Sequence, residues 1–300
     1  MNVIKLIRSY FYNNTYAGAD DVVVIKDADG RMICSPFFVN FPVHSVEATA
    51  CDPTVDMRIN GETIDFEGVK VDRITGRCYF VQSDFTQAFR IPDELLHKLK
   101  LLNGRNQVSF QLKNTVLKLM IYFCDPSQKI VVINASQGLF DRAKLPALFR
   151  KVARNGYLFL YISTQNNINQ VEATRATIRE RDFPEGPVIF TPCAPTPVAP
   201  QESFIVKTLR GFQGSQGSIY GNRLYAGVGE VQHKRLFVLS GIPAGKYFAV
   251  EEEEIEGSFS ISDMCDVVEF CFPPNPVSHE AFNSHNFWRI PILKNETKIK

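Results

Sequence analysis

Hydrophobic and polar residues alternate in short runs through the first part of the chain. Between residues 21 and 82 the runs are separated by turn pairs such as Asn60-Gly61 and Thr75-Gly76. Alternation places successive side chains on opposite faces of a strand, and an Asn-Gly pair favours a tight hairpin. The pattern therefore predicts a domain of short strands with a sandwich-like arrangement, to which we assign residues 20–115.

The hydrophobic pattern changes at Lys129, where apolar residues become continuous instead of alternating. Continuous β-branched and aromatic runs are typical of strands buried on both faces, and helical spacing between them indicates covering helices. Strands and helices that take turns along the chain predict a parallel sheet with helices on its faces, which we assign to residues 116–272. The expected strands are Ile130–Ile133, Tyr157–Ile162, Val188–Phe190 and Leu236–Leu239, and the expected helices are Leu145–Asn155 and Val171–Asp182.

Both ends of the chain carry segments suited to contact a membrane surface. Residues 1–19 have the spacing of an amphipathic helix, with Lys5 and Arg8 opposite the apolar face. Such a helix either packs on the core or lies in the membrane plane. In the second case the membrane-binding residues are Val3, Ile4, Ile7 and Phe11. In the tail, residues 273–300, we expect Trp288 to pack on the β domain, with a place at a membrane interface as the alternative.

Composition and charge narrow the classes of protein. The 300 residues include 33 Lys and Arg against 32 Asp and Glu, so the net charge of +1 gives no general attraction to nucleic acid. With 45% hydrophobic residues, the chain is too apolar to stay disordered. The seven cysteines show no C-x-x-C spacing, so we expect no zinc site. Since no apolar run reaches the roughly 18 residues of a membrane span and the start lacks signal-peptide features, we expect a cytoplasmic protein.

Four segments, in the order in which they occur, resemble segments of the lipins, the Mg²⁺-dependent phosphatidate phosphatases. They are Asp21 through Val39 with Ile59-Asn60-Gly61-Glu62, then Leu99 through Asn106, then Val152 through Tyr161, and finally Asn286 through Ile292. The resemblance covers nearly the whole chain. It implies an immunoglobulin-like β-sandwich joined to a haloacid-dehalogenase-like parallel-sheet α/β domain, a fold of the α+β or α/β class. The long linker of lipins is missing, and residues 84–104 are its nearest substitute.

The resemblance also implies where the chemistry of the family lies. Lipins carry a D-x-D-x-T motif after the first parallel strand, in which the first Asp attacks phosphorus, the second exchanges protons, and Mg²⁺ offsets the phosphoryl charge. In this chain Asn134, Ser136 and Gly138 stand at those positions. An amide is a poor nucleophile and a weak Mg²⁺ ligand, and a hydroxyl does not exchange protons near pH 7 as a carboxyl does. Ser163 falls where the family holds phosphate with a serine.

Two further positions of the family's site are altered. The stretch that supplies a late Mg²⁺ carboxylate is shortened to residues 228–230, and Lys207 is the nearest counterpart of the lysine that offsets phosphoryl charge. Such catalytic groups act as a unit, so their joint loss predicts no turnover by the family mechanism, no functional catalytic residue, and no bound metal or cofactor. We interpret His233, which two basic residues follow, as part of a solvated loop, with anion binding as the alternative.

Three functions stay open from the sequence. The first is a catalytically inactive lipin-like pseudophosphatase, a membrane-associated scaffold or regulator of lipid metabolism. Its partners would be a lipid surface with phosphatidate-type lipids and an active lipin paralogue, without nucleic acid, at the cytoplasmic periphery of the endoplasmic reticulum or nuclear membrane. The second is a residual Mg²⁺-dependent phosphatidate phosphatase that produces diacylglycerol and uses Asp141 or Glu230. The third is a lipid-binding or protein-interaction module that does not insert into membranes.

Overall fold

The structure is a computed structural model of the chain, and it separates into two compact units. The first is formed by Met1–Pro126, Ile162–Thr177 and Gly186–Ile219, and the second by Ser127–Tyr161, Ile178–Glu185 and Tyr220–Lys300. The described residues are 17–26, 30–36, 38–42, 45–46, 53–66, 68–73, 75–81, 87–88, 90–124, 127–163, 169–190, 223–242, 244–250, 259–261 and 268–274.

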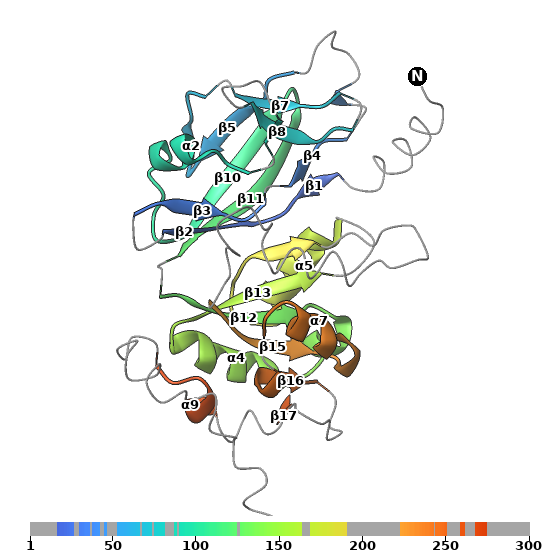
Figure 1. The fold of residues 1–300 in the computed structure, drawn as a ribbon. Helices are drawn as coiled ribbons and strands as arrows, with labels where there is room; N and C mark the ends of the chain where they lie inside the picture. The colour runs from blue at the N-terminus through green and yellow to red at the C-terminus, as the bar shows by residue number, and fades with distance from the viewer. Residues whose placement is uncertain are drawn as a thin grey trace, which may run out of the picture. The chain divides into compact units, whose positions relative to one another are not determined.

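Six described strands of the first unit form one sheet with the order β3-β2-β11-β10-β5-β6 (Figure 1). β10 and β11 pair antiparallel along a long hairpin, from Gly104 opposite Phe123 to Leu112 opposite Thr115. β2 joins β11 in parallel. The six strands are β2 (Val22–Lys26), β3 (Met32–Cys34), β5 (Asp56–Ile59), β6 (Glu62–Thr63), β10 (Gly104–Leu112) and β11 (Thr115–Cys124). Smaller sheets are formed by β1 (Gly18–Ala19) with β4 (Val39–Asn40), and by β7 (Val69–Val71), β8 (Cys78–Val81) and β9 (Gln87–Ala88).

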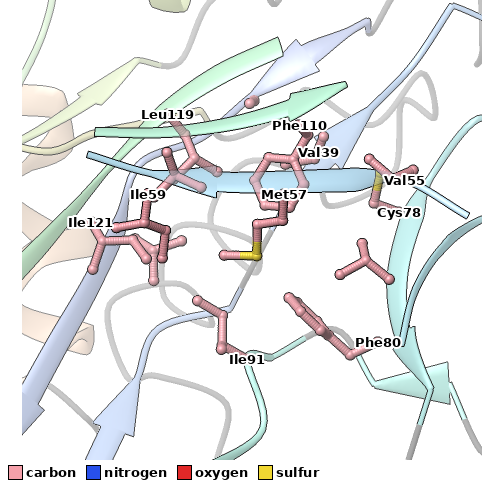
Figure 2. Packing of buried hydrophobic residues seen from close by; sticks show 14 of the residues in the cluster. Val39, Val55, Met57, Ile59, Cys78, Phe80, Ile91, Phe110, Leu119 and Ile121 are labelled. Atoms are coloured by element: carbon pink, nitrogen blue, oxygen red, sulfur yellow. The ribbon is translucent and has the colours of Figure 1, made fainter. Parts of the chain in front are cut away.

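Two of these sheets share one apolar core. Met57 and Ile59 of β5 lie in the same buried cluster as Cys78 and Phe80 of β8, together with Phe110 of β10 (Figure 2). The inward-facing residues of β5 alternate with exposed ones, as the sequence pattern predicts for a strand that is buried on one face. The strands on either side of the predicted turns at Asn60-Gly61 and Thr75-Gly76 pair antiparallel, as the hairpin pattern indicates.

The contacts of the first unit extend across the expected boundary, which stays a prediction. The described part of the segment expected to serve as a linker, residues 84–104, includes α2 (Asp93–Lys98), whose Leu95 and Leu96 are buried in the first core. A boundary between residues 115 and 116 would also separate β11 from its hairpin partner β10, and the first unit continues to Pro126. The reason is that strand pairing, which local patterns do not reveal, assigns β11 to the first sheet.

A second sheet has the strand order β14-β13-β12-β15-β16-β17. The pairs β12–β15, β15–β16 and β16–β17 are parallel, so the predicted parallel-sheet region is confirmed and the chain is a mixed α/β protein. The order reverses between β12 and β15. The strands are β12 (Lys129–Asn134), β13 (Tyr157–Ser163), β14 (Val188–Phe190), β15 (Leu224–Gly229), β16 (Tyr247–Ala249) and β17 (Phe259–Ser260).

Short helices connect the parallel strands. In α4 (Leu145–Arg154), the buried residues Leu148, Phe149 and Val152 recur at helical spacing, and the Phe149 ring lies 5.0 Å from that of Phe159 in β13. The segment Leu236–Leu239, predicted as a strand, is instead part of helix α7; a short apolar run does not distinguish the two by itself. The remaining helices are α3 (Gln137–Phe140), α5 (Asn169–Glu180), α7 (Lys234–Leu239), α9 (Val268–Cys271), η3 (Val231–His233) and η4 (Ala244–Lys246).

The predicted membrane contacts lie almost wholly outside the described part of the chain. This applies to the helical segment with Val3, Ile4, Ile7 and Phe11 and to the tail residue Trp288, so both stay predictions. Among the helices that the structure describes, none is long and apolar enough to cross a membrane.

One buried carboxylate joins several segments of the first unit. Asp21, directly before β2, accepts hydrogen bonds from the backbone amides of Met120 and Val188, each 2.8 Å long. Arg175 of α5 donates to both carboxylate oxygens and lies 2.6 Å from the nearer one. The side chain of Asp21 is 1% exposed and that of Arg175 is 14% exposed. Because an unpaired buried charge is costly, these bonds fix β11, β14 and α5 around the start of β2.

We expect Asp21→Ala to lower the free energy of unfolding by about 3–5 kcal/mol, because it leaves the Arg175 guanidinium without its buried partner. Urea unfolding measures the loss. The control is Glu269→Ala, which breaks an ion pair with Lys151 whose side chains are 50% (Lys151) and 77% (Glu269) exposed; this change should stay below about 1 kcal/mol. Equal losses in the two variants would contradict the role given to Asp21.

Candidate functional site

The carboxyl ends of β12 and β15 meet where the strand order of the parallel sheet reverses. Asn134 is the last residue of β12 and Gly229 is the last residue of β15, and the preceding residues, Ile133 and Val228, are paired. In open α/β sheets, ligands bind outside the carboxyl ends of strands at such a reversal. The topology therefore makes the surroundings of Asn134 the candidate site.

Asn134 is buried and hydrogen-bonded to an imidazole. Its side chain belongs to a residue that is 3% exposed, and Nδ2 lies 2.8 Å from Nδ1 of His233. The amide donates this bond when Nδ1 is unprotonated; with a proton on Nδ1, the amide oxygen would have to face the ring. Within the described residues, Oδ1 of Asn134 is buried without a hydrogen-bond partner. A buried oxygen in that state gains free energy from any donor that reaches it.

The loop after β12 also buries the hydroxyl of Ser136. The backbone amide of Ser136 donates to the carbonyl of Asn134 (2.9 Å), and the Ser136 carbonyl accepts bonds from the backbone amides of Leu139 and Phe140, which end α3. These bonds fix the loop, while the Ser136 Oγ atom is buried with no partner among the described residues. The Oδ1 atom of Asn134 and the Oγ atom of Ser136, two residues apart in the sequence, thus each have unused hydrogen-bonding capacity.

The other two predicted site residues differ in their surroundings. Gly138 is exposed in α3, and a Cβ added there would meet no atom within 4 Å. Ser163 ends β13 and is buried. It lies in a segment of the first unit, so the site is built here from Asn134, Ser136 and η3. Lys207 lies outside the described residues.

His233 is the residue whose role the sequence interpretation missed. The single turn η3 follows β15 and turns this side chain, which is only partly exposed, onto Asn134. The interpretation as a solvated loop is therefore wrong. The Oε2 atom of Glu230 lies 3.9 Å from the same Nδ1, and the Glu230 carbonyl accepts a 2.7 Å bond from the Tyr247 hydroxyl. In the sequence, the position of residues 230–233 directly after a buried strand is the one feature that could indicate a place for His233 at the site.

Glycine is required in β15 because the site is closely packed. A Cβ on Gly229 would lie 2.9 Å from the Cβ of Asn134 and 2.9 Å from the Tyr247 hydroxyl oxygen. A Cβ on Gly227 would lie 2.9 Å from the Tyr247 ring and 3.1 Å from the Phe237 ring. Because neither glycine has a side chain, the fully buried Tyr247 can pack against β15 and support the turn that carries His233.

The site residues do not fit a Mg²⁺ ion well. Magnesium prefers carboxylate and water oxygens in near-octahedral geometry, whereas Asn134 and Ser136 offer neutral oxygens. Asp141 is an exposed residue and pairs with Arg181 at 3.3 Å, on the surface rather than in the site. In the described ranges, no group of three or more His, Cys, Asp or Glu side chains is placed to hold a metal ion. The side chains of Asn134 and Ser136 offer neutral hydrogen-bonding groups and no carboxylate.

The mixed α/β fold, with its buried site at the reversal of strand order, can now be compared with known proteins. Residues 1–99 match the family described as lipin, N-terminal conserved region. The human protein named phosphatidate phosphatase LPIN1 is 32% identical over 123 residues, which are 41% of this chain and 13% of that protein. Phosphatidate phosphatase PAH1 of Arabidopsis thaliana is 27% identical over 247 residues, 67% of this chain and 26% of that protein.

The same comparison finds the nuclear elongation and deformation protein 1 of Schizosaccharomyces pombe, 23% identical over 258 residues, 70% of this chain and 39% of that protein. The resemblance to the lipins is thus confirmed for residues 1–99 by the family match, and these relatives extend the similarity further along the chain. It spans 13–39% of the length of these relatives. The similarity to amylomaltase from Corynebacterium glutamicum has a TM-score of 0.19 and 15% identity over 54% of this chain and 23% of that chain, which is too low to bear on the fold.

We expect Gly229→Ala to lower the free energy of unfolding by about 1–3 kcal/mol, because the added methyl group overpacks the contact between β12 and β15. Urea unfolding checks the value. The matched control is Gly138→Ala, where the new methyl group meets open space and should leave stability unchanged or slightly higher. A Gly229→Ala protein as stable as the control would show that β12 and β15 do not approach this closely.

Proposed function

We propose that the chain is a catalytically inactive lipin relative, a pseudophosphatase that acts as a scaffold or regulator of lipid metabolism at a membrane surface. The match of residues 1–99 to the lipin N-terminal region supports a role related to phosphatidate metabolism, since the matched human and Arabidopsis relatives are named phosphatidate phosphatases. The observation that carries the proposal is Asn134, a neutral amide at the carboxyl end of β12 where the resemblance calls for a nucleophilic carboxylate.

The side chains at this position favour binding over group transfer. In the mechanism that the resemblance implies, the phosphoryl group moves to a carboxylate, and neither position 134 nor position 136 has one. Asn134 is hydrogen-bonded to His233 through its Nδ2 atom. Its Oδ1 atom and the Ser136 hydroxyl can bond a ligand without forming a covalent intermediate. The site is thereby suited to hold a polar group and to leave it unchanged.

The finer fold assignment is part of the same proposal. An immunoglobulin-like sandwich for the first unit is supported by two sheets around one core, from β5 and β10 on one side and β8 on the other. A haloacid-dehalogenase-like domain is supported by the parallel pairs and by the reversal of strand order between β12 and β15. In this assignment Asn134 ends β12, the first strand of the parallel sheet along the chain, which is where the family motif begins.

Membrane contact belongs to the terminal segments in this proposal. The apolar residues Val3, Ile4, Ile7 and Phe11 would lie in the interface, and Trp288 would add an aromatic anchor. With a net charge of +1, attachment is mainly hydrophobic and only weakly sensitive to salt. The partners are a phosphatidate-containing lipid surface and an active lipin paralogue, and the location is cytoplasmic, peripheral to the endoplasmic reticulum or the nuclear membrane.

A residual Mg²⁺-dependent phosphatidate phosphatase is the second candidate, and one observation favours it. Glu230 brings a carboxylate to within 3.9 Å of His233, close to Asn134. A single carboxylate beside neutral oxygens is a weak set of ligands for Mg²⁺, and Asp141 is engaged with Arg181 instead. A third candidate, a lipid-binding or protein-interaction module without membrane insertion, differs only in the role of the terminal segments.

Phosphate release from phosphatidate vesicles in the presence of Mg²⁺ tests the inactive assignment. We expect the full chain to release no phosphate above the protein-free rate. We also expect Asn134→Asp combined with Ser136→Asp to stay inactive, because residues 228–230 do not restore the late metal carboxylate. Loss of one member of a catalytic constellation costs about 10⁴-fold or more, so partial repair leaves turnover below detection.

Two results would overturn the inactive assignment. Mg²⁺-dependent release that falls in Glu230→Gln or Asp141→Asn, but not in the surface control Glu269→Gln, would support the second candidate. Turnover in the Asn134→Asp, Ser136→Asp double variant would show that the interpretation of residues 228–230 is wrong.

Liposome flotation tests the membrane segment. We expect Ile7→Glu to reduce flotation of the full chain at least about tenfold, because burying a carboxylate in the interface opposes the hydrophobic contact of the helix. The matched control is Ser9→Glu, which places the same charge on the polar face and should change flotation little. Identical flotation of wild type and both variants would remove the helix from the account and favour the third candidate.

A further inference from the structure

Three basic side chains gather at the amino-terminal ends of the parallel strands. Lys129 is the first residue of β12, and Arg223 directly precedes β15, whose first residue Leu224 pairs with Ile130. Lys246 directly precedes β16, which pairs in parallel with β15. The register therefore places all three at one edge of the sheet. We call Lys129, Arg223 and Lys246 the basic cluster.

The three charges are close enough to influence one another. Burial, with a second contribution from the charge on Lys129, lowers the pKa of Lys246 to about 7. Burial also lowers the pKa of Lys129, with a second contribution from Arg223. Each cation thus disfavours the charged form of its neighbour. A bound anion would offset this repulsion between like charges.

An aromatic platform holds Lys246 in place. Its Nζ atom lies 4.7 Å from the centre of the Tyr225 ring, in a cation–π contact. The Tyr225 ring packs edge-on against Tyr157, with 4.7 Å between ring centres, and its hydroxyl donates a 2.7 Å bond to the carbonyl of Cys271. Because Tyr225 is itself buried and bonded, it fixes the ammonium group rather than leaving it on a freely moving side chain.

We propose that the basic cluster is a binding site for a phosphate monoester. A guanidinium group offers paired donors that match phosphate oxygens, and two ammonium groups add point charges suited to a dianion. The cluster is separate from the Asn134 site: β12 has six residues, so Lys129 and Asn134 are about 16 Å apart along the strand. The inference therefore stands whether or not the Asn134 site is catalytic.

The phosphate monoester can come from a soluble metabolite or from the headgroup of a lipid. Two probes separate these sources with the full chain. Glycerol 3-phosphate, measured by calorimetry, reports binding of a soluble ester. Cosedimentation with phosphatidylcholine vesicles, with and without phosphatidate, reports binding of a headgroup at a surface.

We expect wild type to bind glycerol 3-phosphate, and Lys246→Met and Arg223→Gln each to weaken binding about tenfold or more. Lys98→Met, which removes an exposed lysine of α2, should bind as wild type does. The melting temperature of Lys246→Met, measured alongside, separates a loss of binding from a loss of folding, and Arg223→Gln provides an independent second test.

Cosedimentation with vesicles shows whether the phosphate monoester belongs to a lipid headgroup or to a soluble metabolite. Loss of phosphatidate-dependent cosedimentation in Lys246→Met and Arg223→Gln supports a lipid headgroup, and its retention, with weakened glycerol 3-phosphate binding, supports a soluble ester. The proposal is overturned if wild type binds neither probe, or if both cluster variants bind both probes as tightly as wild type. Weakening by Asn134→Ala, with the cluster variants unaffected, would also overturn it by moving the ligand to the other site.

Discussion

The parallel pairing of β12 with β15 is the constraint on which the candidate site depends. It joins strands that are almost 100 residues apart in sequence and brings Asn134 beside Gly229. The contact is close enough that a single methyl group on Gly229 would fall 2.9 Å from the Asn134 side chain. The same closeness lets Tyr247 hold the turn that presents His233. The packing of these two strands thus determines which side chains meet at the site, independently of any ligand.

The neutral character of the site has an electrostatic consequence. Two carboxylates buried side by side repel each other and require a cation or a proton to relieve the repulsion. An amide and a hydroxyl at positions 134 and 136 need neither, and the Asn134 amide is paired with an imidazole across the strand ends. The fold can therefore close around this site without Mg²⁺. In contrast, the buried charge of Asp21 is retained, because Arg175 and two backbone amides compensate it.

The sequence predicts local structure well and side-chain neighbours poorly. Period-two alternation in β5 and continuous apolar runs in β12 and β13 indicate the correct strands, because burial on one face or two leaves a local pattern. The run at Leu236–Leu239 is too short to distinguish a strand from a helix. The boundary near residue 115 and the contact between Asn134 and His233 both depend on pairings across long sequence separations, which no local pattern contains.

The proposed function requires that the Asn134 site has lost the metal chemistry that the resemblance to lipins implies. Electron paramagnetic resonance with Mn²⁺ tests this most directly, because Mn²⁺ takes the same oxygen ligands as Mg²⁺ and its free-ion signal disappears on binding. The account predicts that the full chain leaves the free-ion signal unchanged at micromolar Mn²⁺. A stoichiometric loss of that signal in wild type, restored by Asn134→Ala, would contradict it.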